Sequence, residues 1–359
     1  EVVAVQYDDV KEYTEGLATV ERGGKVGVVD RSGELRVPMD YTEVGEFVNG
    51  LAYAERDDAY GFIDANGGER IAFGYTSAAG FKNGFATVEK DDRAGVIDAK
   101  GAVVVPFAYD WVEGFTNGVS RVRNGDHMGL IDARGNSVLP VEHEHVGTFN
   151  DGLALVIDHG KCGYVDTAGK WAIAQQYDAP EGTATWGDFH NGFAEVMKKG
   201  KHGLIDGKGQ VFFPIQWQDL GSLDDGLVPV KKNDRWAYAD LAMNVRGAFA
   251  YDMAWELKNG YARVKTENGF GMIDSTGELV INPGYGKLSD ARSGLVVAMQ
   301  DDRSGVLDVR GNTVLPFDFD AITLADAPLV RLERAGALAW YRLDTRSWIW
   351  KEAGFDAPR

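Results

Sequence analysis

A period of 34 residues constrains the fold of this chain more than any other feature. A glycine that begins a short apolar stretch recurs at this spacing, with one longer interval of 40 residues between Gly152 and Gly192. The column consists of Gly16, Gly50, Gly84, Gly118, Gly152, Gly192, Gly226, Gly260 and Gly294, with Pro328 in the tenth place. An aromatic column follows the same spacing, at Tyr7, Tyr41, Tyr75, Tyr109, His143, Tyr177, Trp217, Tyr251, Tyr285 and Phe319. Together with a column of aspartates, these positions indicate ten tandem copies of one unit over residues 7–352.

Each unit carries strand and turn signals and no helical period. In the stretch "LATV" (17–20), which reappears as "FATV", "LALV" and "YARV", the second and fourth residues share one face of a strand because side chains alternate. These residues are small or β-branched, so we expect this face to pack against a close neighbour. Asn-Gly or Asp-Gly pairs such as Asn49-Gly50 precede the strand and suit the positive φ angles of a two-residue hairpin turn.

The second strand of the unit ends in an aspartate, as in "GFID", and a glycine three residues later closes the turn. We interpret the repeated aspartate as a turn residue, because one carboxylate per turn supplies too few oxygens for calcium. A third strand such as "AVVVP" follows, and its proline is expected to end it. Each unit is therefore predicted to hold three short antiparallel strands and an extended segment led by the aromatic residue, which is a candidate fourth strand.

The pattern "F-x-N-G-x-A-x-V … G-x-I-D-x-x-G-x-x-x-x-P-x-x-Y-D" resembles the bacterial WG-repeat family, also called KWG, over nearly the whole chain. The Trp-Gly dipeptide that names the family is missing, since Val26, Tyr60 and Ala94 stand before the glycine and Trp236 is followed by Ala237. The resemblance implies a β-rich repeat scaffold, often exported, in which no catalytic motif is established.

The fold expected is all-β, with ten tandem antiparallel β-repeats of about 34 residues in an open curved or superhelical array. The alternative is a pair of five-bladed, propeller-like rings, because the single long interval leaves five aromatic positions on each side. The expected divisions are a cap strand at 1–6, repeats one to five at 7–176, repeats six to ten at 177–352, and a tail at 353–359.

The amino-acid composition limits the classes of partner that this chain is expected to bind. The formal net charge of −18 disfavours nucleic acid and anionic membranes, and no apolar run is long enough for membrane insertion. Cys162 is the only cysteine, so no internal disulfide can form. The first residue is not Met, which together with the family resemblance suggests a bacterial protein exported to the periplasm or cell surface, with the cytoplasm as the other possibility. The oligomeric state stays open.

No catalytic motif, cofactor motif or metal site is predicted. His143 and His145 have a spacing that suits zinc, but His143 fills the aromatic column and is better explained as a packed ring. Cys162 and His202 occupy equivalent places in successive units, which are too far apart to share an ion. The function expected is a non-enzymatic scaffold that binds a protein or glycan on an extended face. The alternative is a carbohydrate-active or other hydrolytic enzyme whose carboxylates depart from the repeat.

The candidate binding residues lie where the repeat is interrupted. Eleven residues separate Tyr177 from Phe189, whereas five separate Tyr109 from Phe115, so six residues are inserted within 178–188. Insertions in repeat proteins often form loops on the binding face. The hypothesis is that Trp186 contacts the partner, with Asp188 and His190 beside it. The alternative is a connector in which Trp186 covers the junction between the two halves.

Overall fold

The computed structural model describes residues 7–179, 187–223, 226–325 and 328–356. Every regular element in these residues is a β-strand, and none of them forms a helix that could cross a membrane. The prediction of an all-β protein is confirmed.

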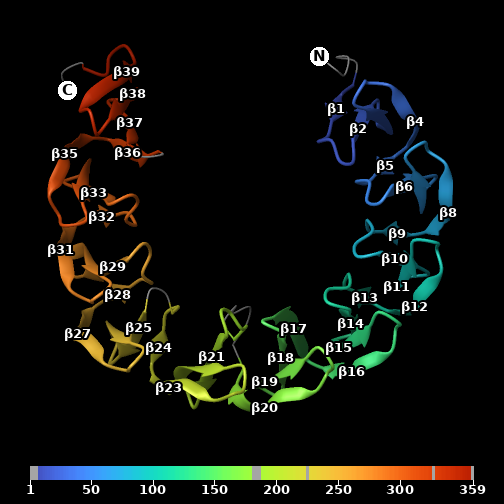
Figure 1. The fold of residues 1–359 in the computed structure, drawn as a ribbon, viewed down its shortest axis with the longest axis horizontal. Helices are drawn as coiled ribbons and strands as arrows, with labels where there is room; N and C mark the ends of the chain where they lie inside the picture. The colour runs from blue at the N-terminus through green and yellow to red at the C-terminus, as the bar shows by residue number, and fades with distance from the viewer. Residues whose placement is uncertain (1–6, 180–186, 224–225, 326–327, 357–359) are drawn as a thin grey trace. The chain divides into compact units, whose positions relative to one another are not determined.

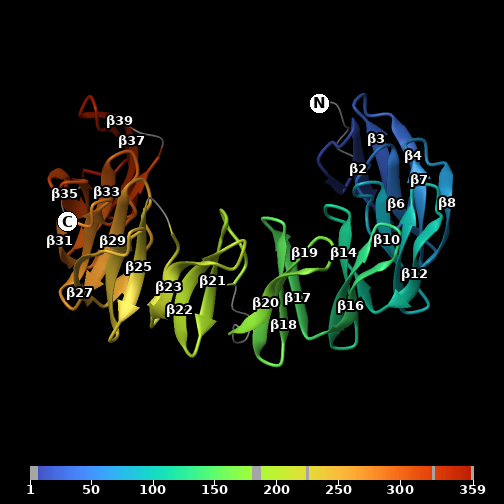
Figure 2. The same ribbon diagram turned by 60° about the horizontal axis from the view of Figure 1, so that its bottom comes forward.

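Contacts divide the chain into two units, which are described separately (Figures 1 and 2). The first comprises Glu1–Ala194 with Asp206–Gln210, and the second comprises Glu195–Ile205 with Val211–Arg359. Within each repeat the strands pair in the order of the sequence.

The strands of the first five repeats are β1 (Asp9–Val10), β2 (Leu17–Arg22), β3 (Lys25–Asp30) and β4 (Leu35–Tyr41); β5 (Glu43–Val44), β6 (Leu51–Arg56), β7 (Ala59–Asp64) and β8 (Glu69–Tyr75); β9 (Ser77–Ala78), β10 (Phe85–Lys90), β11 (Arg93–Asp98) and β12 (Val103–Tyr109); β13 (Trp111–Val112), β14 (Val119–Asn124), β15 (His127–Asp132) and β16 (Ser137–His143); and β17 (His145–Asn150), β18 (Leu153–Asp158), β19 (Lys161–Asp166) and β20 (Trp171–Asp178).

The strands of the last five repeats are β21 (Phe193–Lys198), β22 (Lys201–Asp206) and β23 (Val211–Trp217); β24 (Asp219–Leu220), β25 (Leu227–Lys232), β26 (Arg235–Asp240) and β27 (Val245–Tyr251); β28 (Met253–Ala254), β29 (Tyr261–Thr266), β30 (Gly269–Asp274) and β31 (Leu279–Tyr285); β32 (Lys287–Leu288), β33 (Leu295–Gln300), β34 (Arg303–Asp308) and β35 (Thr313–Phe319); and β36 (Ala321–Leu324), β37 (Leu329–Arg334), β38 (Ala337–Arg342) and β39 (Ser347–Lys351).

The second sheet shows how one repeat is built. The short strand β5 pairs antiparallel with β6, so the segment led by the aromatic residue supplies the predicted fourth strand. Asn49 and Gly50 join the two segments with φ angles of 51° and 75°, as the Asn-Gly signal predicts. The Asp64 carboxylate accepts hydrogen bonds from the backbone N–H groups of Asn66 at 2.8 Å and Gly68 at 2.9 Å. The aspartate column therefore holds turns, as expected.

Small side chains pack each sheet onto the one before it. Ala52 and Ala54 on β6 are 1% and 0% exposed and belong to one apolar cluster with Val28 and Val37 of the first repeat. These alanines are the second and fourth residues of the repeated stretch, so the predicted packing face is confirmed. Because the face is shared with the preceding sheet, the core lies between repeats as well as within them.

The third strand differs from the prediction that proline ends it. Strand β4 continues through Pro38 to Tyr41, and its register with β3 shifts between Val37↔Val28 and Tyr41↔Val26. Three residues of β4 therefore arch over Gly27 alone, in a β-bulge. Pro38 is tolerated because it lies in the bulge, where its missing N–H is not needed for the ladder.

The bulge explains why a glycine precedes the buried residues of the second strand in most repeats. A Cβ on Gly61 would lie 2.9 Å from the Ile71 carbonyl oxygen, which is too close for any side chain. The seventh repeat carries Ala237 at this position. Its register runs from Tyr238↔Arg246 to Trp236↔Tyr251, so four residues instead of three arch across the larger side chain.

The sheets of each unit follow one another in an open row (Figure 1). In the first unit β3 packs near β5, β7 near β9, β11 near β13 and β15 near β17; the second unit repeats this with β26 and β28, β30 and β32, and β34 and β36. Among the described residues, no such packing joins the first sheet of a unit to its last. The tandem array is therefore confirmed in preference to closed rings.

The structure describes the C-terminal end of the array but not the N-terminal six residues. Residues 1–6, the expected cap strand, lie outside the described residues. At the other end, β39 pairs with β38 as the last strand, and Phe355 from the tail is 1% exposed in the final apolar cluster. The tail thus covers the core of the tenth repeat.

Substituting Gly61 by Ala should lower the free energy of unfolding by about 1–3 kcal/mol, because the new methyl group meets the Ile71 carbonyl oxygen and the Phe73 ring, each at 2.9 Å. Gly74→Ala is the matched control in the same repeat, since nothing lies within 4 Å of its added Cβ, and should change stability by less than about 0.5 kcal/mol. Urea denaturation of both variants measures the difference, and equal effects would contradict the role assigned to the bulge.

Candidate functional site

The residues that follow the insertion are held firmly against the first unit. Trp186 lies outside the described residues, whereas Asp188 and His190 are described. On either side of Asp188, the Gly187 carbonyl accepts a hydrogen bond from the Tyr164 hydroxyl at 2.5 Å, and the Phe189 ring meets the Tyr164 ring edge-on at 4.8 Å. Asp188 is thus fixed at the surface of the fifth repeat.

Asp188 lies among cationic and titratable groups from two earlier strands. We call Arg121, His145, Asp188 and His190 the Asp188 cluster. Burial raises the pKa of the Asp188 carboxyl, although the charges of His190, His145 and Arg121 act in the opposite direction. Burial also lowers the pKa of His145, and the positive charge of Arg121 adds to this effect.

Arg121 is already engaged by other groups. Its guanidinium donates two hydrogen bonds of 2.8 Å to Glu113 and lies 5.7 Å from the centre of the Trp111 ring. Within the described parts of the chain, Asp188 has no ion pair or hydrogen bond of its own. A partly desolvated carboxylate without a partner is a common feature of binding sites. Sequence reasoning identified Asp188 and His190 but did not place Arg121 or His145 beside them, because both stand at positions whose residue type varies from repeat to repeat.

The two histidines of "HEH" take separate roles. His143 ends β16, is 9% exposed and holds its Nδ1 atom 2.7 Å from Asp158 Oδ2, whereas His145 begins β17. Burial would raise the pKa of Asp158, but hydrogen bonds from His143, Gln175 and the Glu144 backbone outweigh it and lower the pKa. His143 therefore packs in the aromatic column as predicted. Cys162 is buried, and burial raises the pKa of its thiol to about 11, so it stays protonated at neutral pH.

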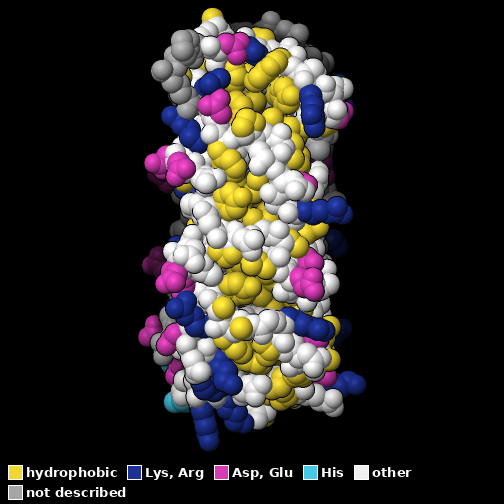
Figure 3. Space-filling model, turned by 90° about the vertical axis from the view of Figure 1, so that its left-hand side faces the viewer, with side chains coloured by type: hydrophobic (Ala, Val, Ile, Leu, Met, Phe, Trp, Pro, Cys, Tyr) yellow, Lys and Arg dark blue, Asp and Glu magenta, His cyan; other side chains and the backbone are white. Residues whose placement is uncertain are grey.

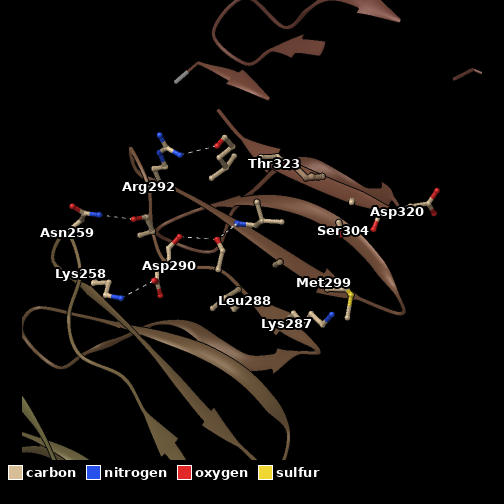
Figure 4. A pocket seen from close by; sticks show the side chains of 17 residues that line it. Lys258, Asn259, Lys287, Leu288, Asp290, Arg292, Met299, Ser304, Asp320 and Thr323 are labelled. Atoms are coloured by element: carbon tan, nitrogen blue, oxygen red, sulfur yellow. Dashed lines mark hydrogen bonds and ion pairs between the residues drawn. The ribbon is translucent and has the colours of Figure 1, made fainter. Parts of the chain in front are cut away.

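The second unit contains a pocket of about 870 Å³ between its last three repeats (Figure 4). Its floor is apolar, with Leu288, Ala291 and Ala298 each at most 4% exposed. The rim carries Lys258, Lys287, Asp290, Arg292, Asp320 and Thr323. The pocket opens where Val297 and Ser304 occupy the positions that Tyr53 and Tyr60 fill in the second repeat.

Most of the charged rim is held in place by neighbouring groups. Asp290 Oδ1 lies 2.7 Å from Arg263 Nε, and Asp290 Oδ2 lies 3.6 Å from Lys258 Nζ. Arg292 donates to the Leu324 carbonyl at 3.2 Å. Lys287 is exposed, and among the described residues no carboxylate or acceptor engages its ammonium group. The rim therefore offers an unpaired cation above an apolar floor.

A band of apolar side chains runs along another side of the second unit, with charged residues beside it (Figure 3). Exposed Val245, Leu279 and Val314 lie on β27, β31 and β35, the long strands of successive repeats. Rings pair between these repeats, as in Tyr285 and Phe317 with centroids 5.8 Å apart. We interpret this band as part of the packing between repeats, since its rings stack on one another.

The sequence of this chain matches a known family of repeat proteins. The model of the family described as a WG containing repeat matches residues 1–25, 27–58, 60–93, 95–126, 128–162, 163–201, 203–236 and 270–303. A search of curated proteins finds no match to the sequence.

Among solved structures, the chain is similar to a crystal structure titled as the eukaryotic initiation factor, with 10% identity, a TM-score of 0.37, and coverage of 84% of this chain and 95% of that one. It is also similar to PorZ, a surface component of the type-IX secretion system of Porphyromonas gingivalis, with 10% identity, a TM-score of 0.28, and coverage of 88% and 52%. The extracellular domain of the hybrid two component system BT3049 from B. thetaiotaomicron matches with 9% identity, a TM-score of 0.28, and coverage of 99% and 60%. Likenesses this weak do not bear on the function of this chain.

Asp188→Asn should make the protein more stable than the wild type at pH 7. The folded-state pKa of Asp188 is raised, so the folded protein loses stability as the pH rises from about 4 through that pKa, and a neutral amide avoids this loss. The difference should disappear near pH 3. Thermal melts at both pH values measure it, with exposed Asp126→Asn as the control. A variant less stable than the wild type at pH 7 would show that the charged form is needed for folding.

Proposed function

Because this chain belongs to the WG-repeat family, we propose that it is a non-enzymatic β-repeat scaffold that binds a partner protein, anchored in the pocket of the second unit. The single observation that carries the proposal is the volume of about 870 Å³ with a buried apolar floor, which suits the side chains of a short peptide segment. Tandem repeats extend the surface on either side of such an anchor.

The chemistry of the pocket favours a particular kind of segment. The floor formed by Leu288, Ala291 and Ala298 accepts an apolar side chain, and the unpaired ammonium of Lys287 accepts a carboxylate beside it. None of the described lining residues is aromatic, so the pocket lacks the flat ring on which a sugar usually stacks. We therefore propose a peptide ligand with an apolar residue next to an acidic residue, in preference to a glycan.

The Asp188 cluster and the inserted residues are a second part of the proposal. Asp188 is half-buried, His190 is exposed, and the positive charge of Arg121 acts on Asp188, so the cluster offers both signs of charge to a partner. Trp186 remains the aromatic anchor in this hypothesis. Trp186→Ala should then weaken partner capture without lowering the melting temperature.

Export to the periplasm or cell surface is also proposed. It is supported by the match to the WG-repeat family, since the family resemblance implies a scaffold of a kind that is often exported, and fractionation of the source organism tests it directly. Recovery in the cytoplasm alone would overturn it.

Filling the pocket should weaken capture of the partner. Ala321 is exposed at the pocket wall, so Ala321→Trp places a large ring in the pocket, and we expect at least about tenfold weaker capture. Ala248→Trp is the matched control, because Ala248 is exposed on β27 outside the pocket. Tagged wild type and both variants are used to capture proteins from envelope and cytoplasmic fractions, followed by quantitative mass spectrometry.

Two results would contradict the proposal. One is equal capture by the wild type and Ala321→Trp. The other is turnover of glycoside or ester substrates that a single carboxylate substitution abolishes, which would identify the chain as an enzyme.

A further inference from the structure

Three residues with metal-binding side chains meet in the second unit. Glu195 on β21, His202 on β22 and Asp219 on β24 each offer one ligand atom, and these atoms all lie within 4.8 Å of one another. His202 Nδ1 lies 2.6 Å from Glu195 Oε1, and the two side chains are 16% and 22% exposed. The three groups come from three strands of two successive repeats, so the fold itself brings them together.

The repeat shows that the scaffold does not require these residue types. The same three positions hold Thr87, Ala94 and Trp111 after the third repeat, and Val297, Ser304 and Ala321 after the ninth. At no other described place do all three positions carry an imidazole or a carboxylate. Other repeats fold with apolar, neutral or cationic residues at single positions of this set, such as Arg121, Arg263 and Lys287, so the scaffold accepts many residue types here and does not itself require the combination of Glu195, His202 and Asp219.

The charge balance favours a bound cation. Two carboxylates beside one neutral imidazole give a net negative charge in a partly buried place, where such charges are costly without a counter-ion. A divalent cation at this place would contact both carboxylates and balance their charge.

The donor set selects the kind of metal. Imidazole nitrogen with carboxylate oxygen suits first-row transition metals, whereas calcium prefers six to eight oxygens. Bonds of about 2.0–2.2 Å place the ligand atoms of a tetrahedral zinc ion roughly 3.4 Å apart, so small rotations of the side chains would suffice. We propose that Glu195, His202 and Asp219 bind one divalent transition metal, with Zn²⁺ as the first candidate and solvent as the remaining ligand.

The experiment titrates the untagged protein, after dialysis against EDTA, with ZnCl₂ by calorimetry and in competition with a chromophoric chelator. We expect one site per chain, at least about tenfold weaker binding in His202→Ala and in Asp219→Asn, and a zinc-dependent rise in melting temperature that both variants lose. His127→Ala and Glu267→Gln, which change exposed residues of the same types, should bind as the wild type does.

Circular dichroism shows whether each variant is folded. If His202→Ala does not fold, Asp219→Asn still tests the site, because it preserves the shape of the side chain. The spectrum of the Co²⁺-substituted protein supplies a second readout, because a tetrahedral site absorbs far more strongly than hydrated cobalt. Wild type that binds no zinc at micromolar concentrations, or variants that bind as the wild type does, would overturn the proposal. Neither result affects the proposed peptide pocket, whose residues are different.

Discussion

The apolar contact between one sheet and the next is the interaction on which the structure depends. A sheet of four short strands has too little core to be stable alone, and in this chain each buries a face of small residues against the preceding sheet. Ala52 and Ala54 illustrate this, since they reach Val28 and Val37 of another repeat. Because this contact recurs between successive repeats within each unit, the residues that form it can vary little, whereas those outside it can vary freely.

That freedom explains why one backbone supports several local chemistries. The groove between successive sheets is filled by Tyr53 and Tyr60 in one repeat, opens into a pocket beside Val297 and Ser304 in another, and gathers Glu195 and His202 in a third. The packing face is the same in each case. In a protein of this kind the variable positions beside a constant packing face are therefore where the chemistry of the groove changes from repeat to repeat.

The glycine in the second strand of most repeats is also explained by a contact with a neighbouring strand. It lies under the bulge of the third strand, where a Cβ on Gly61 would meet a backbone oxygen. The copy with Ala237 keeps the bulge only by lengthening it, with Gly247 at a φ of 75°. The position before this glycine faces no such constraint, which is consistent with the loss of the family's tryptophan from most repeats of this chain.

The sequence by itself determined the repeat, the strands, the Asn-Gly and Asp turns, and the packing of His143 as a ring, because these depend on alternation and on contacts between residues close together in the chain. Only the tertiary structure decided that β4 passes through Pro38, since the bulge depends on the partner strand. It alone brought the charge of Arg121 to act on Asp188, and Asp219 on β24 to Glu195 on β21. Such groups meet only once the sheets have packed. The spacing and register of the strands decide which side chains of neighbouring sheets come into contact, and the local sequence does not.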